Sequence, residues 1–355
     1  MKIEKQKKRI KDSVENRTEH WPDERELLTV AAAVAGGSTW KLLCLFSLLL
    51  ITGCKYIHPN ESPQANGQTK KDTVLTAGYI PPEIPLMMTD PQQRASYHVA
   101  HYWDGYALTD TAFIRGGNTE QLFADFIGAL QYVSPEESSA ALKRMMCRME
   151  ADSMAYERFC LLSEKYLYDP NSPMRNEDYY IPVLEQMVAS QSLSEVDKIR
   201  PADRLKQAHK NRPGMTATDF SYVTPKGQAG RMSRIKAAYT LLFFYDPDCS
   251  NCRKYEQILS EMPAFLEMQE KGTLRVLAVY PDDNEEEWLL KSSGMPRGWI
   301  VGWNKQGDIR SKVLYEIRAT PTLYLLDKQK RVILKDASLK QTIQYLSAVY
   351  PGPTE

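Results

Sequence analysis

An apolar segment that ends in two closely spaced cysteines constrains the fold of this chain more than any other stretch. Residues 239–245 are aliphatic or aromatic apart from Thr240, which is typical of a buried β-strand. After a short polar interruption, Cys249 and Cys252 open a segment whose apolar residues recur at helical spacing. A thiol at a helix start lies beside unpaired N–H groups and the positive end of the helix dipole, which favour a thiolate. The C-x-x-C pair therefore indicates thiol–disulfide chemistry.

Predicted strands and helices alternate through the C-terminal region, residues 213–355. This alternation predicts a sheet with parallel strands and helices packed on it, and a closing hairpin makes the expected sheet mixed. The predicted strands are residues 219–223, 239–245, 274–280, 299–303, 322–327 and 332–336. The predicted helices are residues 250–270, 283–291, 309–317 and 339–349. Pro263 is the candidate position for a kink in the first of them.

Helical periodicity dominates the preceding region, residues 75–212. Ser134 followed by Pro135 and two acidic residues is typical of a helix start. Apolar side chains then recur on one face of a long predicted helix, at Leu142, Met145, Met146 and Met149. We expect an all-α domain of about five helices. With the C-terminal region, this makes the chain α+β.

Two groups of residues in the helical region have the residue types of reactive sites. His98 and His101 lie three apart with Asp104 one turn further on, the spacing of part of a metal site or of partly buried polar residues. Cys147 and Cys160 would lie about 20 Å apart on one continuous helix, too far for a disulfide. We expect these two cysteines to be buried free thiols.

The N-terminal region contains one short apolar run, residues 42–51. It is too short to span a bilayer and has the length of a signal-peptide core. Small residues before Cys54 resemble the bacterial lipoprotein box, which implies lipid attachment at that cysteine. We expect residues 1–53 to be a leader with a lipoprotein signal peptide and residues 54–74 to be a flexible tether. The alternatives are an uncleaved membrane anchor and an apolar core segment.

Lipidation at Cys54 predicts an extracytoplasmic, membrane-anchored chain in a compartment where disulfides persist. Lys55 stands where many lipoproteins retained in the inner membrane have aspartate, which favours the outer membrane facing the periplasm.

The chain has 45 basic and 45 acidic residues. This balance gives no support for nucleic acid as a partner.

Residues 213–350 resemble a thioredoxin-fold domain of the TlpA/ResA-like kind found in extracytoplasmic proteins. The resemblance rests on residues 218–222 before a glycine turn, on the strand that precedes the cysteines, and on residues 318–322. The last of these, Arg-Ala-Thr-Pro-Thr, matches the family's cis-proline loop. The helical region resembles an uncharacterised domain that precedes such modules in lipoproteins of anaerobes.

The resemblance implies roles for individual residues. Cys249 would attack a substrate and Cys252 would resolve the mixed disulfide. Thr320 and Pro321 would form the loop that faces the cysteines, with Pro321 preceded by a cis bond. The acid buried below the active site of thioredoxins falls near Phe243, a residue that carries no proton. Glu256, one turn past Cys252, is therefore a candidate proton shuttle.

We expect a thiol–disulfide oxidoreductase that acts on protein thiols or disulfides without a cofactor. Family tendency favours the reductive direction, which would require a membrane electron-donor protein as partner. The alternative is a redox-silent binding or scaffold lipoprotein in which the C-terminal domain is structural. The pair would then be a static disulfide, since a zinc site lacks its other two ligands in this domain. No peroxidase motif precedes Cys249.

Overall fold

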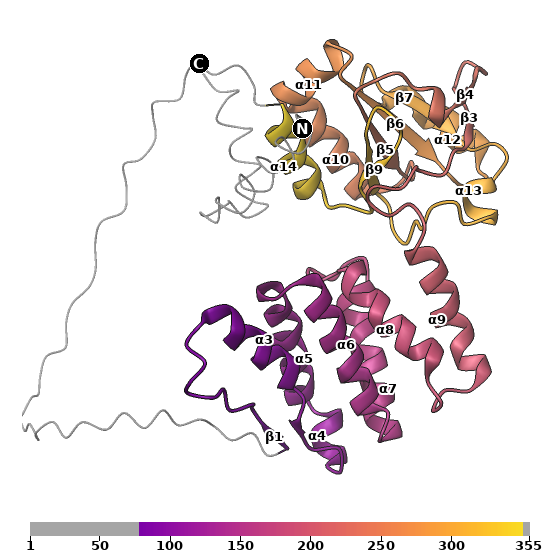
Figure 1. Cartoon of the computed structure of the whole chain (residues 1–355). Coiled ribbons are helices and arrows are strands. Elements are labelled where there is room, and N and C mark those ends of the chain that lie inside the picture. Colours follow the sequence, from indigo (N-terminus) through magenta and orange to yellow (C-terminus); the bar gives the residue numbers. More distant parts are fainter. Residues whose placement is uncertain (1–77, 351–355) are drawn as a thin grey trace, which may run out of the picture. The chain divides into compact units, whose positions relative to one another are not determined.

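The computed structural model describes residues 78–350, in which helices are followed by a β-sheet with its own helices (Figure 1). We call residues 78–212 the helical part and residues 213–350 the sheet part. Both belong to one compact unit, Leu75–Glu355. The predicted leader, the tether and Cys54 lie outside the described residues. Within residues 78–350, no helix has the length and hydropathy needed to cross a bilayer.

The helical part contains more helices than the sequence predicts. A short antiparallel pair, β1 (Tyr79–Ile80) and β2 (Gly105–Tyr106), accompanies them. The α-helices described here are α3 (Pro91–His101), α4 (Thr111–Arg115), α5 (Gly117–Ala129), α6 (Pro135–Met149), α7 (Ser153–Ser163), α8 (Glu177–Ala189) and α9 (Glu195–Ala208). A 3₁₀ turn, η1 (Leu130–Tyr132), follows α5, and a π-helical turn, η2 (Glu164–Tyr168), follows α7.

Local capping explains why one predicted long helix is two. Asp152 has an extended backbone, and its carboxylate accepts a hydrogen bond from the N–H of Ala155. This residue therefore interrupts the helix after α6 and caps the start of α7. The predicted start of α6 is confirmed, because Ser134 and Glu137 form a capping box. The sequence pattern showed the helical period but missed the break, since apolar spacing continues across it.

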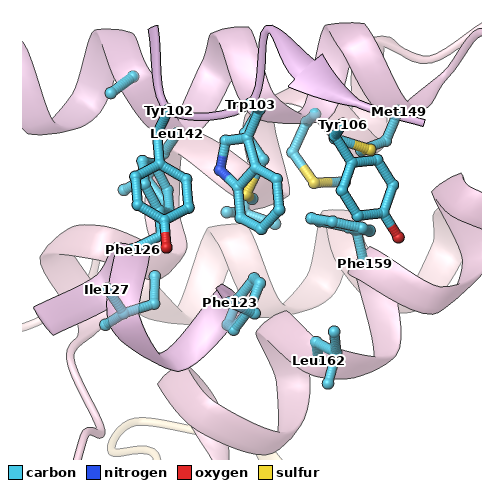
Figure 2. Packing of buried hydrophobic residues seen from close by; sticks show 14 of the residues in the cluster. Tyr102, Trp103, Tyr106, Phe123, Phe126, Ile127, Leu142, Met149, Phe159 and Leu162 are labelled. Atoms are coloured by element: carbon cyan, nitrogen blue, oxygen red, sulfur yellow. The ribbon is translucent and has the colours of Figure 1, made fainter. Parts of the chain in front are cut away.

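An aromatic cluster forms the core of the helical part (Figure 2). The Trp103 ring lies edge-on to Phe159 with ring centroids 4.9 Å apart, and edge-on to Tyr106 at 5.5 Å. Such pairs add about 0.5–1.5 kcal/mol each beyond the burial of apolar area. The predicted apolar face of α6 is confirmed, since Leu142, Met145, Met146 and Met149 are all buried.

The sheet part has a seven-stranded mixed sheet in the order β4-β3-β7-β6-β5-β8-β9. β5 pairs with β6 and β6 with β7 in parallel, while the other neighbours are antiparallel. The predicted mixed sheet is confirmed. The strands are β3 (Ser221–Val223), β4 (Ala229–Arg231), β5 (Tyr239–Phe244), β6 (Leu274–Tyr280), β7 (Ile300–Trp303), β8 (Thr322–Leu326) and β9 (Val332–Leu334).

The central strand β5 is buried on both faces because helices or loops cover each side. Leu241 and Phe243 point to the face covered by α10 (Ser250–Glu261), α11 (Pro263–Glu270) and α14 (Leu339–Val349), which lie together in Figure 1. Leu242 and Phe244 point to the opposite face, where Ile309 and Tyr315 pack. A continuous apolar run is what such a strand requires.

The sheet part differs from the predictions at four elements. The predicted helix 250–270 is two helices, because Met262 is extended and Pro263 begins α11 at a position where its missing N–H costs nothing. The predicted helix 309–317 is only α13 (Asp308–Ser311). Val313 has φ 45°, a left-handed conformation that a helix does not contain. Strand β4 was not predicted, and α12 (Glu285–Lys291) is slightly shorter than expected.

Candidate active site

The Cys249 thiol occupies the helix-cap position at the carboxyl end of β5. Its backbone is extended, and its Sγ accepts a hydrogen bond from the N–H of Cys252 at 3.1 Å. A tight turn holds it there, since the N–H of Cys249 donates to the carbonyl of Asp246 at 3.1 Å. The Asp246 carboxylate also accepts from the N–H of Asp248 at 2.8 Å. A sulfur in the cap position satisfies an N–H that the helix leaves free.

The loop before β8 also contacts the Cys249 thiol. Cys249 Sγ donates a hydrogen bond to the carbonyl oxygen of Thr320 at 3.2 Å, although the two residues are 71 positions apart. The Thr320–Pro321 peptide bond is cis, the isomer expected for this loop. The structure thus brings Cys249, Cys252 and Thr320 together.

The two thiols differ in their access to solvent. Cys249 is partly exposed, whereas Cys252 is 1% exposed. Burial raises the pKa of the Cys252 thiol well above its usual range, and the contact with Cys249 raises it further. A thiol of this kind needs a nearby proton acceptor before it can act as a nucleophile.

Glu256 lies one helical turn beyond Cys252 on α10. Its carboxyl is half-buried, and this burial raises its pKa from 4.5 to about 7, although Arg253 opposes the shift. Burial raises the pKa of the Tyr245 phenol, and negative charge on Glu256 or Cys252 raises it further, so both groups lie within electrostatic reach of this phenol. An acid with this pKa exists in both protonation states near neutral pH.

A charged pair borders the site on the solvent side. The carboxylate of Asp248 forms an ion pair with the ammonium of Lys291, which also contacts Glu287 at 2.7 Å. A hydrogen bond with Glu287 and the pair with Lys291 hold the pKa of Asp248 below its usual range. Lys291 therefore partly neutralises the carboxylate that precedes the thiol in the chain.

Phe243, near which the resemblance places the buried acid of thioredoxins, lies in the core of the sheet part. It is fully buried, and its ring lies edge-on to Trp299 with centroids 5.4 Å apart. This position is therefore apolar in the structure.

The other residues singled out from the sequence lie in the helical part. His101 Nδ1 pairs with Asp104 at 2.6 Å, and the His98 ring stands edge-on to Tyr102. Burial lowers the pKa of His98. Over residues 78–350, no group of three or more metal-ligating side chains is positioned to hold an ion.

The expectation that Cys147 and Cys160 are buried was wrong for Cys147. Cys147 is exposed, with its thiol donating to Gln186 at 3.1 Å, because it lies on the outer side of α6. Cys160 is mostly covered, and burial raises the pKa of its thiol to about 12.

Comparison with known proteins agrees with this architecture. Residues 55–211 match a domain of unknown function, DUF5106, and residues 237–332 match a model described as thioredoxin-like. The chain shares 40% identity with a thioredoxin-like protein from Bacteroides caccae whose crystal structure is known. The match covers 76% of this chain and 97% of that chain, with a TM-score of 0.72. The chain belongs to the thioredoxin-like proteins.

Shorter structures also resemble this thioredoxin-like protein. A conserved protein of unknown function from Bacteroides fragilis is 67% identical over 38% of this chain and 98% of its own, with a TM-score of 0.38. A domain of a possible thiol-disulfide isomerase from Cytophaga hutchinsonii is 27% identical over 41% of this chain and 99% of its own, with a TM-score of 0.35. No curated protein matches the chain.

Sequence reasoning missed the long-range contacts of two residues, Lys291 and Arg318. Lys291 lies 43 positions from its partner Asp248. Arg318 forms hydrogen bonds to Asp336 and to Tyr168, which is 150 positions away. Neither has a local motif, although Arg318 stands inside the sequence that matches the cis-proline loop.

Proposed function

We propose that this thioredoxin-like protein is a thiol–disulfide oxidoreductase that acts on protein disulfides or thiols. The observation that carries the proposal is the position of the Cys249 thiol, partly exposed at a helix start and 3.2 Å from the Thr320 carbonyl. A structural thiol is usually fully buried, whereas an exchanging thiol must meet its substrate.

In the reductive direction the exchange has two steps. The Cys249 thiolate attacks one sulfur of a substrate disulfide, forming a mixed disulfide and releasing the other sulfur as a thiolate that takes up a proton. Cys252 then loses its proton and attacks the Cys249 sulfur, which releases the second substrate thiol. Two electrons pass to the substrate, and a dithiol reductant must regenerate the Cys249–Cys252 pair.

Glu256 accepts the proton that Cys252 loses in the second step. Burial raises the pKa of the Cys252 thiol, so few molecules hold it as a thiolate near neutral pH. The raised pKa of Glu256, about 7, makes its carboxylate a stronger base than an exposed glutamate.

The site of action that we propose is the extracytoplasmic face of a membrane, with the outer membrane facing the periplasm favoured. A lipid on Cys54 would anchor the chain, and residues 54–74 would act as the tether. The support is the apolar run 42–51 followed by Gly53 and the cysteine. A membrane electron donor would supply reducing equivalents from the cytoplasm.

Insulin reduction tests the proposed activity. In the presence of dithiothreitol, the wild-type chain should accelerate insulin precipitation, and Cys249→Ser should lose this acceleration entirely. Cys147→Ser is the matched control, since it removes an exposed thiol outside the site, and it should retain wild-type activity. Equal activity of Cys249→Ser and wild type would reject Cys249 as the nucleophile.

A further inference from the structure

Residues 312–321 connect α13 to β8 and contain no helix or strand. We call this stretch the active-site segment, because it ends at Thr320 and Pro321 and places the Thr320 carbonyl 3.2 Å from Cys249 Sγ. An irregular segment has no ladder of backbone hydrogen bonds. Contacts from other elements therefore determine where it lies.

The helical part supplies contacts along most of the active-site segment. Three of its residues form four hydrogen bonds with four residues of the segment. These bonds join Lys210 to Val313 O at 2.7 Å, Asn211 to Leu314 O at 2.8 Å, the Tyr168 hydroxyl to Glu316 at 2.7 Å, and the Arg318 guanidinium to Tyr168 O.

Of these four residues of the segment, Arg318 is the nearest in the sequence to Thr320. Its side chain is 12% exposed, and its guanidinium donates to the Tyr168 carbonyl and to the Asp336 carboxylate. The guanidinium also lies 4.5 Å from the centre of the Tyr168 ring, and Arg204 lies 4.1 Å from the same centre. Tyr168 ends the π-helical turn η2, where a free carbonyl and the negative end of the helix dipole attract a cation.

The loop after β9 is held by the helical part in the same manner. Arg175 donates to the carbonyl of Asp336 at 2.8 Å, and Asp336 has a left-handed backbone with φ 46°. Lys335 forms an ion pair with Glu177 at 2.8 Å. It also donates to the carbonyls at the end of α9, those of Gln207, Ala208 and Lys210. Two helix ends of the helical part therefore each bind a cation of the sheet part.

We propose that the helical part positions the active-site segment, with Arg318 as the positioning residue, and that this makes the site selective for disulfides carried by polypeptides. The proposal rests on the proposed function and assigns a role to the helical part. An extended polypeptide binds by pairing with backbone groups that are already fixed, such as those beside Thr320. A loosely held segment would have to be ordered during binding, which costs affinity.

A comparison of two disulfide substrates distinguishes positioning of the active-site segment from a general loss of structure. Insulin must lie along the active-site segment, whereas dithiobis(nitrobenzoate), a small aromatic disulfide, needs only access to Cys249. In the full chain, Arg318→Met should lower kcat/KM for insulin about tenfold. A displaced active-site segment would misalign the insulin disulfide with Cys249, and a misaligned disulfide reacts poorly. It should change the rate with the small disulfide less than about twofold.

Two further variants define the cause of the effect. Arg318→Lys keeps the cation but loses the planar fork, so it should restore part of the insulin activity. Arg231→Met removes an arginine–carboxylate pair, with Asp219, that lies outside the active-site segment. This control should leave both reactions unchanged. An equal loss with both disulfides, or no loss with insulin, would overturn the proposal.

Amide hydrogen exchange gives a second readout that does not depend on activity. Arg318→Met should accelerate exchange in residues 312–323 at least about fivefold and leave residues 239–245 at the wild-type rate. Unchanged exchange in residues 312–323 would overturn the proposal. If the wild type reduces neither disulfide, the proposed function fails, and hydrogen exchange alone then decides whether Arg318 positions the segment.

A milder variant is available should Arg318→Met not fold. Lys210→Met removes only the bond to the Val313 carbonyl at an exposed position. It should accelerate exchange within the active-site segment and lower insulin reduction about threefold, since one exposed contact contributes little. Wild-type behaviour in both measurements would count against positioning by the helical part.

Discussion

Asp248, the residue directly before Cys249, forms an ion pair with Lys291 of α12. An unpaired carboxylate at this position would repel a thiolate on Cys249. Lys291 partly neutralises this carboxylate and also contacts Glu287. We therefore expect the reactivity of Cys249 to depend on Lys291, which the local sequence does not reveal.

Removing Lys291 should slow the reaction of Cys249 with iodoacetamide. We expect Lys291→Met to lower the alkylation rate at pH 7 about threefold, and Asp248→Asn to raise it, because exposed pairs interact weakly. Mass spectrometry of the Cys249 peptide measures the rate. Lys271→Met is the matched control, since Lys271 also pairs with a glutamate four residues before it. The effect should shrink in 1 M salt, and an effect that persists there would exclude a through-space charge interaction.

Cys252→Ser should convert the exchange into a covalent trap. The variant still attacks a substrate disulfide, but no thiol remains to release the product, so the mixed disulfide on Cys249 accumulates. Non-reducing mass spectrometry should show the adduct on the peptide that contains Cys249. Turnover of this variant at the wild-type rate, or an adduct on Cys147, would be incompatible with the proposed order of attack.

Glu256→Gln should slow the second step of the exchange. We expect a loss of about tenfold or more, because a positioned proton acceptor contributes about 100-fold and water replaces part of it. In the wild type, the rate of resolution should rise with pH through about 7, the raised pKa of Glu256. The Gln variant should lack this inflection. Stopped-flow release of a chromophoric thiol measures the rate of the second step and its pH dependence. The same pH profile in the wild type and in Glu256→Gln would remove Glu256 from the mechanism.

The same residue should affect stability with a defined sign. Because burial raises the pKa of Glu256 from 4.5 to about 7 in the folded state, the folded chain binds the proton more tightly than the unfolded chain. The free energy of unfolding should therefore fall as pH rises through this window. The shift corresponds to about 3 kcal/mol for an enclosed group, and we expect about 1 kcal/mol because Glu256 is half-exposed. Urea titrations at pH 4.5 and 8 measure this free energy for the wild type and for Glu256→Gln. The wild type should lose about 1 kcal/mol more than the variant between the two pH values. An equal loss in both proteins would refute the prediction.

Cys54→Ser should release the chain from membranes. A lipid on this residue would contribute about 0.8 kcal/mol for each buried CH₂ group, and the rest of the leader would be removed on processing. Ultracentrifugation of cell fractions, followed by immunoblotting, measures the distribution. Cys44→Ser is the control, since that cysteine lies inside the predicted signal peptide. A Cys54→Ser protein that still sediments with membranes would argue against lipid anchoring.

The sequence predicted those features that rest on local patterns. The apolar run of β5, the helix cap before α6 and the apolar face of α6 each follow from neighbouring residues. The strand-to-helix position of Cys249 and Cys252 also needed only local spacing. The break at Asp152 was missed because helical periodicity continues across it.

Features made by distant residues could not be predicted in the same way. The ion pair of Lys291 and the contacts of Arg318 depend on how α12 and η2 pack in the folded chain. The spacing of residues along the sequence does not reveal this packing. The early end of α13 follows from the left-handed backbone at Val313, a conformation that no propensity assigns to a β-branched residue. The half-burial of Glu256 was likewise visible only in the packed structure.

The reduction potential of the Cys249–Cys252 pair tests the central claim most directly. The full chain would be equilibrated in dithiothreitol or glutathione buffers, its free thiols trapped with a maleimide, and the labelled cysteines located by mass spectrometry. The account predicts a reversible potential between about −120 and −270 mV, the range of known exchange proteins. A pair that stays oxidised below about −300 mV would be a structural disulfide and would contradict the account.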